Sequence, residues 1–437
     1  MFIKNLQEFK NKSATLKGWI YNLRSSGKIM FLQLRDGTGF CQCILERETL
    51  KQVQGDKRAE ELWNQAQKIT LESSVELTGT VTEHPKNKNE FELQVKDFKI
   101  YQIPSEEYPI SKKEHGPEFL LDNRHLWLRS KKQWAIMRIR DEIIRATYSF
   151  FYKNNFIKID SPILTPNACE GTTTLFDLKY FDLGKAYLSQ SGQLYLEAAI
   201  MAHSRVFDFG PTFRAEKSKT RRHLTEFWMM DAEMAFCDHE CNMQMQENLI
   251  LYIIKQVLKN KKPELEILER DVAKLEKIKA PFGRITHNEA VKKLQKLGSK
   301  ITAKDDLGAE DETLLTKDSD APIFVEKWPK EIKAFYMKRD SENSDVVLGS
   351  DLIATEGHGE IIGGSQREDD YEVLKARIIK EKLPLKEFAW YLDLRKFGSV
   401  PHSGFGYGLE RLTGWITGIH HIRETIPFPR LINRITP

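Results

Sequence analysis

Cysteine is scarce in this chain, with five residues among 437. Cys41 and Cys43 form a C-x-C pair that an extended strand places on one face, whereas Cys169, Cys237 and Cys241 are scattered. No C-x-x-C pair occurs, which argues against a zinc ribbon and against a disulfide framework. This cysteine usage predicts a reducing, cytoplasmic compartment.

Long hydrophobic runs are also missing. No stretch reaches the ~18 consecutive apolar residues that a membrane-spanning helix needs, so we expect no membrane partner. The opening residues, MFIKNLQEFKNK, contain no apolar segment long enough for a secretory signal peptide.

Neither sign of charge is in large excess. The 67 basic and 63 acidic residues leave a formal net charge of +4, which excludes a protein that coats nucleic acid by charge alone. Local basic surfaces remain compatible with this balance. The length predicts two to three domains at ~150 residues each, and 40% hydrophobic residues supply apolar surface for packed cores.

Five short strand patterns lie near the beginning of the chain. Asp36-Gly37, a dipeptide typical of hairpin turns, separates the second pattern from the third. Five strands and one helix in this length predict a small β-barrel of the OB-fold kind, which binds oligonucleotides across its second and third strands. The strand patterns are residues 13–23, 29–35, 39–45, 74–82 and 91–101, and a charged helical stretch lies at 48–67.

Prolines mark a boundary after this barrel. Three of them fall within the irregular stretch 104–130, which predicts a hinge between a barrel domain over 1–103 and a larger domain over 131–437. A Lys-rich, mainly helical insertion is expected at about 255–325. Blocks of opposite charge adjoin there, which favours an ordinary solvated surface.

The common nucleotide-binding motifs do not occur. The absence of G-x-G-x-x-G and of G-x-x-x-x-G-K-[ST] argues against a dinucleotide fold and a P-loop. Instead, two strand patterns within 210–236 flank a basic loop, 217–223, which could hold a polyphosphate. Arg214 and Glu216 share one strand face, and Phe227 could stack on a base. An exposed basic hairpin with ordinary ion pairs explains the same pattern equally well.

Two glycine-rich segments follow toward the C-terminal end. Within 351–367, Asp351 and Glu360 supply the oxygen ligands that Mg²⁺ takes beside nucleotide phosphates, although purely structural carboxylates are the alternative. Residues 404–411, GFGYGLER, place glycine at alternate positions before a helix that carries Arg411. Such a backbone lets a planar ligand or a phosphate approach closely, but taken alone the pattern is a weak signal.

The order of the motifs is more specific than any one of them. Residues 156–166, FIKIDSPILTP, indicate an edge strand or interface segment, because proline cannot donate to a central ladder. This segment, then FRAE…RRHLTEF, then GFGYGLER resembles the three motifs of class II aminoacyl-tRNA synthetases. With a barrel at the N-terminus, the chain resembles the aspartyl, asparaginyl and lysyl group. The strings FLLDNRHLWL (119–128), SQSGQLYLE (189–197), WPKEIKAFYMK (328–338) and VPHSG (400–404) are similar to the asparaginyl family.

The resemblance implies an α+β architecture, with an OB-fold barrel followed by a class II catalytic domain whose antiparallel sheet is flanked by helices. It implies a ligase that activates L-asparagine with ATP and Mg²⁺, releases pyrophosphate and charges tRNA(Asn). Enzymes of this class use positioning and electrostatics rather than a protein nucleophile. A homodimer with Pro162 at its two-fold interface is also implied.

The resemblance assigns roles residue by residue. Arg214 and Arg411 are the implied catalytic residues: Arg214 binds the α-phosphate and the substrate carboxylate, and Arg411 caps adenine over Phe227. The other implied ATP-binding residues are Glu216, Arg222, His223 and Glu360; the amino-acid-binding residues are Glu170, Gln193, Asp231 and Arg367; the metal ligands are Asp351 and Glu360; and the anticodon-binding residues are Arg24, Phe31 and Gln33.

Two of these assignments have a physical argument beside the resemblance. Phe31 and Gln33 are two apart on one strand, so an aromatic platform lies beside an amide, which suits a splayed single-stranded base. Without the resemblance, Phe31 is better explained as barrel core. Where aspartyl enzymes carry Q-S-P-Q-x-x-K, residues 190–196 read QSGQLYL, and Leu196 replaces the lysine that faces the substrate carboxylate.

The loss of that lysine favours an amide substrate over an acid. A carboxylate desolvated without a cation costs several kcal/mol, roughly, whereas a neutral amide needs no such partner. Arg367 could donate to the amide oxygen, and Asp231 or Glu197 could accept from its NH₂ group. The alternatives are the same scaffold charging aspartate, or a paralogue that makes free asparagine or only binds nucleic acid.

Overall fold

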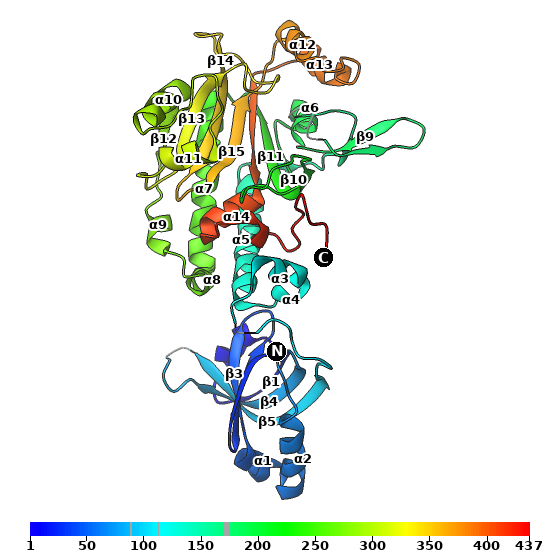
Figure 1. Cartoon of the computed structure of the whole chain (residues 1–437), viewed down its shortest axis with the longest axis vertical. Helices are drawn as coiled ribbons and strands as arrows, with labels where there is room; N and C mark the ends of the chain where they lie inside the picture. Colours follow the sequence, from blue (N-terminus) through cyan, green and yellow to red (C-terminus); the bar gives the residue numbers. More distant parts are fainter. Residues whose placement is uncertain (88–89, 112, 170–174) are drawn as a thin grey trace. The chain divides into compact units, whose positions relative to one another are not determined.

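A computed structural model of the chain describes residues 1–87, 90–111, 113–169 and 175–437. The chain divides into two compact units, Met1–Leu120 and Leu121–Pro437, which can be followed by colour in Figure 1.

The first unit is built around a closed five-stranded barrel in the order β1-β2-β3-β5-β4, so the predicted barrel is confirmed. Along β2 the buried side chains of Met30, Leu32 and Leu34 alternate with half-buried ones, because successive strand residues point to opposite faces. The strands are β1 (Ser13–Ser26), β2 (Ile29–Arg35), β3 (Phe40–Glu46), β4 (Ser74–Glu83) and β5 (Phe91–Gln102), and a 3₁₀ helix, η1 (Ile3–Phe9), precedes them.

The charged helical stretch expected in this unit consists of two helices. They are α1 (Arg47–Gln54) and α2 (Asp56–Ala66), separated by Gly55 at a φ of 78°. Glycine adopts this conformation without strain, which is why the helical pattern breaks there. Leu50 and Trp63 anchor the two helices in the apolar core of the barrel.

The second unit contains an eight-stranded sheet in the order β12-β13-β14-β15-β16-β11-β10-β6 and a three-stranded sheet in the order β7-β9-β8. The interior of the large sheet is antiparallel as expected, but its two outermost pairs, β12–β13 and β6–β10, are parallel. The strands are β6 (Ile157–Lys158), β7 (Leu164–Thr165), β8 (Asp177–Lys179), β9 (Lys185–Leu188), β10 (Arg205–Phe213), β11 (Glu226–Ala235), β12 (Gly283–Thr286), β13 (Ile323–Pro329), β14 (Val346–Ala354), β15 (Gly359–Gln366) and β16 (His402–Gly408).

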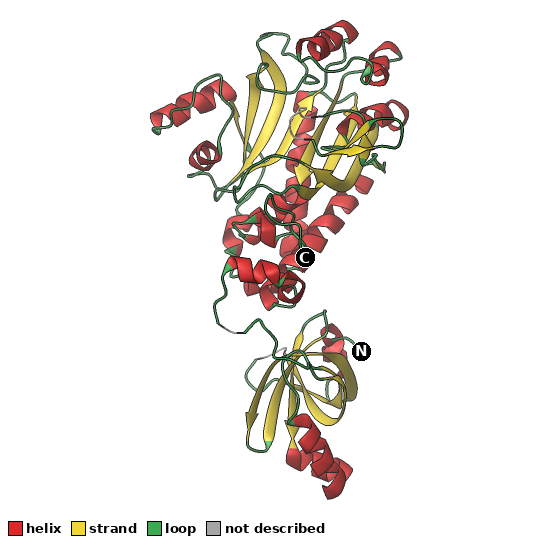
Figure 2. Cartoon of the chain, turned by 45° about the vertical axis from the view of Figure 1, so that its right-hand side comes forward, coloured by secondary structure: helices red, strands yellow, loops and turns green. Residues whose placement is uncertain are grey.

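Helices flank the large sheet and close its apolar core, as Figure 2 shows. Long amphipathic helices carry buried residues at helical spacing, and these pack against the sheet. Phe151 stacks on Phe207 with ring centroids 4.7 Å apart. The helices are α3 (Pro117–Asp122), α4 (Arg124–Trp127), α5 (Lys131–Lys153), α6 (Gln193–His203), α7 (His239–Asn260), α8 (Lys262–Ile267), α9 (Val272–Glu276), α10 (His287–Lys296), α11 (Ala309–Leu315), α12 (Tyr371–Lys380), α13 (Ala389–Lys396), α14 (Leu409–Thr417) and the 3₁₀ turn η3 (Ile422–Glu424).

Part of the stretch expected to be a hinge is packed into the second unit. Arg124 is buried and donates to the backbone carbonyls of Pro427 (2.8 Å) and Ile426 (2.6 Å). These bonds satisfy a charged group that burial would otherwise penalise, so the chain around α4 is an integral part of the second unit.

The stretch 255–325 is more than a helical appendage. It contains α8 to α11, but it also supplies β12, an edge strand of the large sheet. Helices α8 and α9 pack into the main core, whereas α10 and α11 form a separate apolar cluster with the sheet, in which Val291 and Leu294 pack with Trp328 of β13. This stretch is therefore built into the sheet that carries the site described below.

The structure also shows how the cysteines are paired and whether any helix could cross a membrane. Cys237 and Cys241 form a disulfide at the start of α7, a pairing that the cysteine spacing did not predict, while Cys41, Cys43 and Cys169 are buried and form no disulfide. Within the described residues, no helix combines the length and the apolar character needed to cross a bilayer.

Candidate active site

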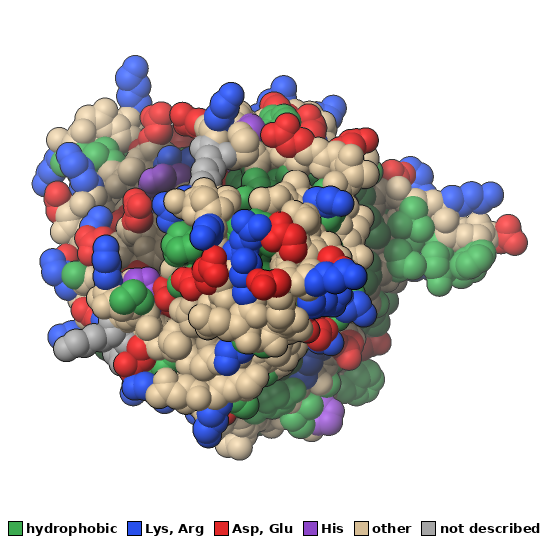
Figure 3. Space-filling model, turned by 90° about the horizontal axis from the view of Figure 1, so that it is seen from below, with side chains coloured by type: hydrophobic (Ala, Val, Ile, Leu, Met, Phe, Trp, Pro, Cys, Tyr) green, Lys and Arg blue, Asp and Glu red, His purple; other side chains and the backbone are tan. Residues whose placement is uncertain are grey.

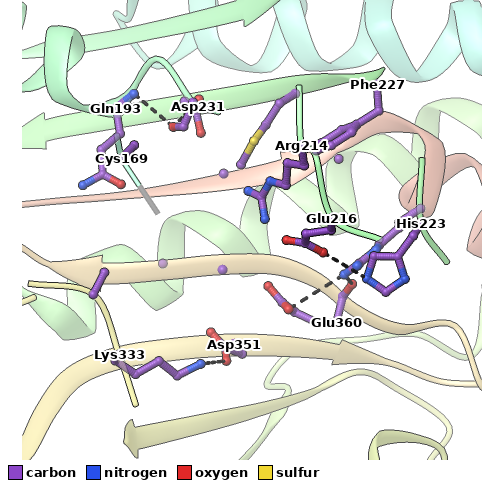
Figure 4. Close-up of a pocket in the computed structure, with 18 of the residues that line it drawn as sticks. Cys169, Gln193, Arg214, Glu216, His223, Phe227, Asp231, Lys333, Asp351 and Glu360 are labelled. Carbon is purple, nitrogen blue, oxygen red and sulfur yellow. Dashed lines mark hydrogen bonds and ion pairs between the residues drawn. The ribbon is translucent and has the colours of Figure 1, made fainter. Parts of the chain in front are cut away.

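A cavity of about 520 Å³ opens on one face of the large sheet. Its walls come from β11, β14, β15, β16, the start of α14 and the loop that joins β10 to β11. Figure 4 shows side chains from these elements pointing into the same space. The sheet therefore brings together residues from the three segments 210–236, 351–367 and 404–411.

One end of the cavity has an aromatic floor and several cations. The guanidinium carbon of Arg214 lies 5.7 Å from the centre of the Phe227 ring, within cation–π range. Arg411, at the start of α14, donates to the carbonyl oxygen of Glu360 at 3.0 Å. Glu216 and His223 face each other across the loop, with 3.8 Å between His223 Nε2 and Glu216 Oε2.

His223 is a neutral imidazole near pH 7. Burial lowers its pKa below the ordinary value, and the nearby cation Arg411 lowers it further. Its Nδ1 lies 3.2 Å from Ser218 Oγ and also contacts Thr220. The ring therefore offers this end of the cavity a hydrogen bond rather than a permanent positive charge.

Arg222 lies at the edge of the cavity, with its side chain tied into the wall. Its Nη2 donates to the carbonyl of Gly357 at 2.5 Å and to Thr313 Oγ1 at 3.1 Å, and its Nη1 is paired with Glu312. This predicted ATP-binding residue thus has its guanidinium engaged by protein groups.

Two carboxylates converge over Gly363. A Cβ on that glycine would lie 2.9 Å from Glu360 Oε1 and 3.8 Å from Asp351 Oδ1. Burial raises the pKa of Asp351 to about 7, with Lys333 opposing and Glu360 reinforcing the shift. In the described part of the chain no three His, Cys, Asp or Glu side chains form a ready metal site. Two carboxylates do fit Mg²⁺ that is also held by nucleotide phosphates.

Lys333 is a functional candidate that the sequence analysis missed. Its Nζ donates to Asp351 Oδ2 at 2.7 Å and lies 3.7 Å from the centre of the Trp328 ring. Asp351 therefore offers its second oxygen to the cavity, while the first is bound by an ammonium (Figure 4). The lysine is within the string WPKEIKAFYMK, whose likeness to the asparaginyl family was the only signal available.

At the other end of the cavity, the buried Arg367 lines the wall and is paired with Glu233 behind it. Arg367 donates through Nε to Glu233 Oε2 at 3.2 Å and makes a second contact with Oε1, in a two-point arrangement. Its Nη1 donates to Ser365 Oγ at 2.7 Å. Glu233 was not predicted, although its spacing of two from Asp231 places both side chains on one face of β11.

Asp231 lies between the two ends and is tied to the start of α6. Its Oδ2 accepts from Ser191 Oγ and from the Gly192 amide, both at 2.9 Å. Asp208 faces it across the β10–β11 pair, and burial together with Asp231 raises the pKa of Asp208 to about 8. The shift reflects the cost of a second buried negative charge beside Asp231.

Gln193 lines the cavity, and a buried network holds it in place. Its Nε2 donates to Glu197 Oε1 at 3.1 Å. Glu197 also accepts from Arg395 Nη2 (2.7 Å) and the Tyr391 hydroxyl (2.7 Å), and His402 Nε2 lies 3.1 Å away. Burial alone would raise the pKa of Glu197, but Arg395 and His402 outweigh it and hold that pKa well below the usual range.

This packing bears on two hypotheses about how an asparagine amide is recognised: the acceptor for its NH₂ group and the role of Leu196. Glu197 does not line the cavity, and the network that holds Gln193 occupies its carboxylate, whereas Asp231 does line the cavity. Glu233, which the sequence analysis did not consider as an acceptor, lies behind the lining and is paired with Arg367, which lines it. Leu196 packs with Ile200 and Val206 and lies outside the cavity lining. Leu196 thus offers no cation to the cavity, and the idea that the lost lysine favours an amide stays a prediction.

The remaining predicted residues lie away from the cavity or outside the residues that the structure describes. Glu170 falls outside the described residues, and its neighbour Cys169 lines the cavity. Pro162 is exposed, beside Ile163 and Leu164, which are 44% and 43% exposed. It follows β6, an edge strand of the large sheet, as its sequence indicated.

In the barrel, the three predicted anticodon readers share one patch of surface. Arg24 of β1 is paired in register with Phe31 of β2. Phe31 and Gln33 are half-buried and alternate with core residues, so Phe31 belongs to the outer face of the barrel and not to its core.

Comparison with known families agrees with this fold. Residues 116–432 match the family of class II tRNA synthetases (D, K and N), and residues 14–101 match the OB-fold nucleic acid binding domain. The chain belongs to the class II tRNA synthetases of the D, K and N group.

Full-length relatives refine this classification. An asparagine–tRNA ligase of Desulforamulus reducens is 52% identical over 435 residues, which covers 100% of this chain and 99% of the relative. Another from Pelotomaculum thermopropionicum is 52% identical over 437 residues, with the same coverage. The asparaginyl-tRNA synthetase of Pyrococcus horikoshii, solved with asparaginyl-adenylate, superposes with a TM-score of 0.94 at 44% identity and covers 100% and 99% of the two chains. Within its group, the chain is a member of the asparagine–tRNA ligase family.

Proposed function

We propose that this chain joins L-asparagine to tRNA(Asn) in two steps. ATP and asparagine form asparaginyl-adenylate and pyrophosphate, and the terminal ribose of the tRNA then takes the asparaginyl group. The observation that carries this proposal is that one cavity joins an arginine–aromatic end to an end lined by Arg367, whose guanidinium is paired with Glu233. A nucleotide and a small polar amino acid fit these ends side by side.

At the nucleotide end, we propose that adenine stacks on Phe227 and that Arg411 covers its other face. Arg214 binds the α-phosphate and the carboxylate of the amino acid, which brings the reacting atoms together and offsets charge that develops during attack. Glu216 meets the adenine edge, and His223 reaches the outer phosphates. Arg222 supports this arrangement by holding the loop, because its guanidinium is already bonded to Gly357 and Glu312.

Mg²⁺ completes this end in our proposal. Asp351 and Glu360 are its ligands from the protein, and the phosphates supply the others. When bound, the ion neutralises phosphate charge and favours departure of pyrophosphate. Lys333 neutralises Oδ2 of Asp351, the oxygen turned away from the ion, which limits the repulsion between the buried Asp351 and the half-buried Glu360.

At the amino-acid end, we propose that Arg367 donates to the side-chain carbonyl of asparagine and that Glu233 accepts from its NH₂ group. Asp231 and Gln193 hold the substrate ammonium. Aspartate would place a carboxylate against Glu233, and buried like charges are strongly unfavourable. A site built around such polar partners discriminates by ~10⁴-fold when the wrong substrate leaves one unpaired.

Outside the cavity, we propose that Arg24, Phe31 and Gln33 read the anticodon of tRNA(Asn). We also propose a homodimer whose interface includes Pro162 and the exposed apolar residues beside it. Figure 3 shows further apolar side chains on the projecting hairpin of β8 and β9, where Phe181 and Leu183 are 77% and 84% exposed. The compartment that fits tRNA charging by this chain is the cytoplasm.

Amino-acid-dependent ATP–pyrophosphate exchange tests the proposed activity. We expect exchange with asparagine and an exchange rate with aspartate at least about a hundredfold lower, because of the charge at Glu233. Exchange with aspartate at a similar rate would show that the cavity accommodates a carboxylate and that Glu233 does not select the amide. Exchange with neither amino acid would refute the proposed function.

A further inference from the structure

Helix α11 (Ala309–Leu315) brings the half-buried carboxylate of Glu312 to the basic loop 217–223 at the nucleotide end. The helix belongs to the stretch 255–325, for which the sequence indicated only a solvated surface. The side chain of Glu312 is 13% exposed, and its Oε2 pairs with Nη1 of Arg222. Its other oxygen, Oε1, accepts from the backbone amide of Glu360 at 3.4 Å. One side chain thus bonds to both the basic loop and strand β15.

The fit around this carboxylate is tight. A Cβ on Gly359 would lie 2.4 Å from both Glu312 Oε2 and Arg222 Nη1, so the ion pair occupies the space beside this glycine. Gly359 also has a φ of +75°, which L side chains rarely adopt. Thr313, on the same helix, accepts a further bond from Arg222 Nη2 at 3.1 Å. The helix therefore fixes the guanidinium of Arg222 from several directions.

These contacts continue to the residue proposed to cover adenine. Arg411 donates through Nε to the carbonyl of Arg222 at 3.4 Å and through Nη1 to the carbonyl of Glu360 at 3.0 Å. The two segments that Glu312 holds are thus the two segments that hold Arg411. Buried charged groups with directional bonds of this kind fix one arrangement of the surrounding side chains.

We propose that Glu312 is a positioning residue for ATP, which sets the basic loop and strand β15 so that Arg411 and Glu360 face the nucleotide. The stretch 255–325 then has a role in ATP binding through this helix. Glu312 acts through other residues and does not itself touch the substrate. The inference rests on the proposed function, because it presumes that the nucleotide occupies the Phe227 end.

Steady-state kinetics of Glu312→Gln test the inference. Glutamine keeps an oxygen for the Glu360 amide but removes the anionic partner of Arg222. We expect the KM for ATP in asparagine-dependent exchange to rise at least about tenfold, the size of one charged hydrogen bond. The KM for asparagine should stay within about twofold, because the Arg367–Glu233 end is not part of these contacts. Glu310→Gln, an exposed acid on the same helix, is the matched control and should behave as wild type.

A second variant and a stability measurement keep the inference testable if Glu312→Gln folds poorly. Thr313→Val removes one bond to Arg222, and we expect a smaller rise in the KM for ATP with an unchanged thermal midpoint. An unchanged KM for ATP in a folded variant would overturn the inference, and so would equal rises in both KM values. If wild type catalyses asparagine-dependent exchange while these variants match it, the inference alone fails. If wild type catalyses no exchange, the proposed function fails.

Discussion

At the residue scale, the cavity is organised by a few buried charges whose partners come from distant parts of the chain. Arg367 on β15 pairs with Glu233 on β11, and Arg395 of α13 pairs with Glu197 of α6. Removing one partner of a buried pair leaves the other charge uncompensated and costs about 3–5 kcal/mol. These side chains therefore stabilise the unit and shape the cavity together.

Arg214 differs from these residues because it has a cation–π contact with Phe227 and lines the open cavity. We predict that Arg214→Ala lowers asparagine-dependent exchange by about 10²–10³-fold, the size of one lost donor to a developing charge. Circular dichroism and the thermal midpoint should stay near wild type. Arg205→Ala, on the preceding strand and outside the cavity lining, is the control. Near-normal exchange by Arg214→Ala would contradict the assignment.

Single residues show how much of the candidate site could be predicted from the sequence. Arg214, Phe227 and Arg411 were predicted from ordered motifs, and the sheet brings all three to one cavity. Glu233 was missed because its partner, Arg367, lies more than a hundred residues away in the sequence. Lys333 was missed because its role depends on its contact with Asp351. No local pattern specifies such a pairing.

At the scale of elements, the glycines of β16 leave space for side chains of the neighbouring strand, which their spacing only partly indicated. A Cβ on Gly404 would lie 2.0 Å from Glu233 Oε1, and one on Gly406 would lie 2.4 Å from Asp231 Oδ1. The space beside these two glycines is therefore taken by carboxylates of β11 and not by a ligand. Only the third, Gly408, leaves ordinary contact distance, 3.8 Å, to Phe227.

We predict that Gly404→Ala displaces Glu233 and disturbs its pairing with Arg367. The added methyl group should cost about 1–3 kcal/mol of unfolding free energy, as overpacking of a filled core does, and asparagine activation should fall as well. Chemical denaturation measures the first effect and exchange the second. Gly210→Ala, in the same sheet with open space around it, should leave both near wild type. Equal stability of the two variants would show that β11 moves aside at little cost.

Strand β2 carries a second prediction at this scale. Phe31 lies on the outer face of the barrel, so Phe31→Ala should raise the KM for tRNA about tenfold, the effect of losing one stacked base. Exchange, which needs no tRNA, should be unchanged. Tyr101→Ala replaces another exposed aromatic of the barrel, on β5, and is the control. Loss of exchange as well as charging would mean that Phe31 supports folding instead.

At the scale of the whole molecule, exposed apolar side chains surround Pro162, where we propose the dimer interface. Ile157, Ile163 and Leu164 are 45%, 44% and 43% exposed and flank Pro162 in the sequence. We predict that wild type sediments as a dimer and that Ile163→Glu shifts it toward monomer, because a charge buried in an apolar interface is unfavourable. Leu297→Glu, at a similarly exposed leucine after α10, should leave the dimer intact. A wild-type monomer at micromolar concentration would contradict the interface.

The sequence by itself determined the barrel, because alternating burial and turn residues act over a few positions. It also determined the class of enzyme, because the three ordered motifs can be recognised in the sequence without any knowledge of packing. The tertiary structure decided what local patterns cannot encode: that Leu196 packs away from the cavity, that Glu233 faces Arg367, and that Glu312 of α11 pairs with Arg222 of the basic loop. Each of these depends on the sheet bringing distant segments together, and the energy of a buried charge depends on its neighbours in space.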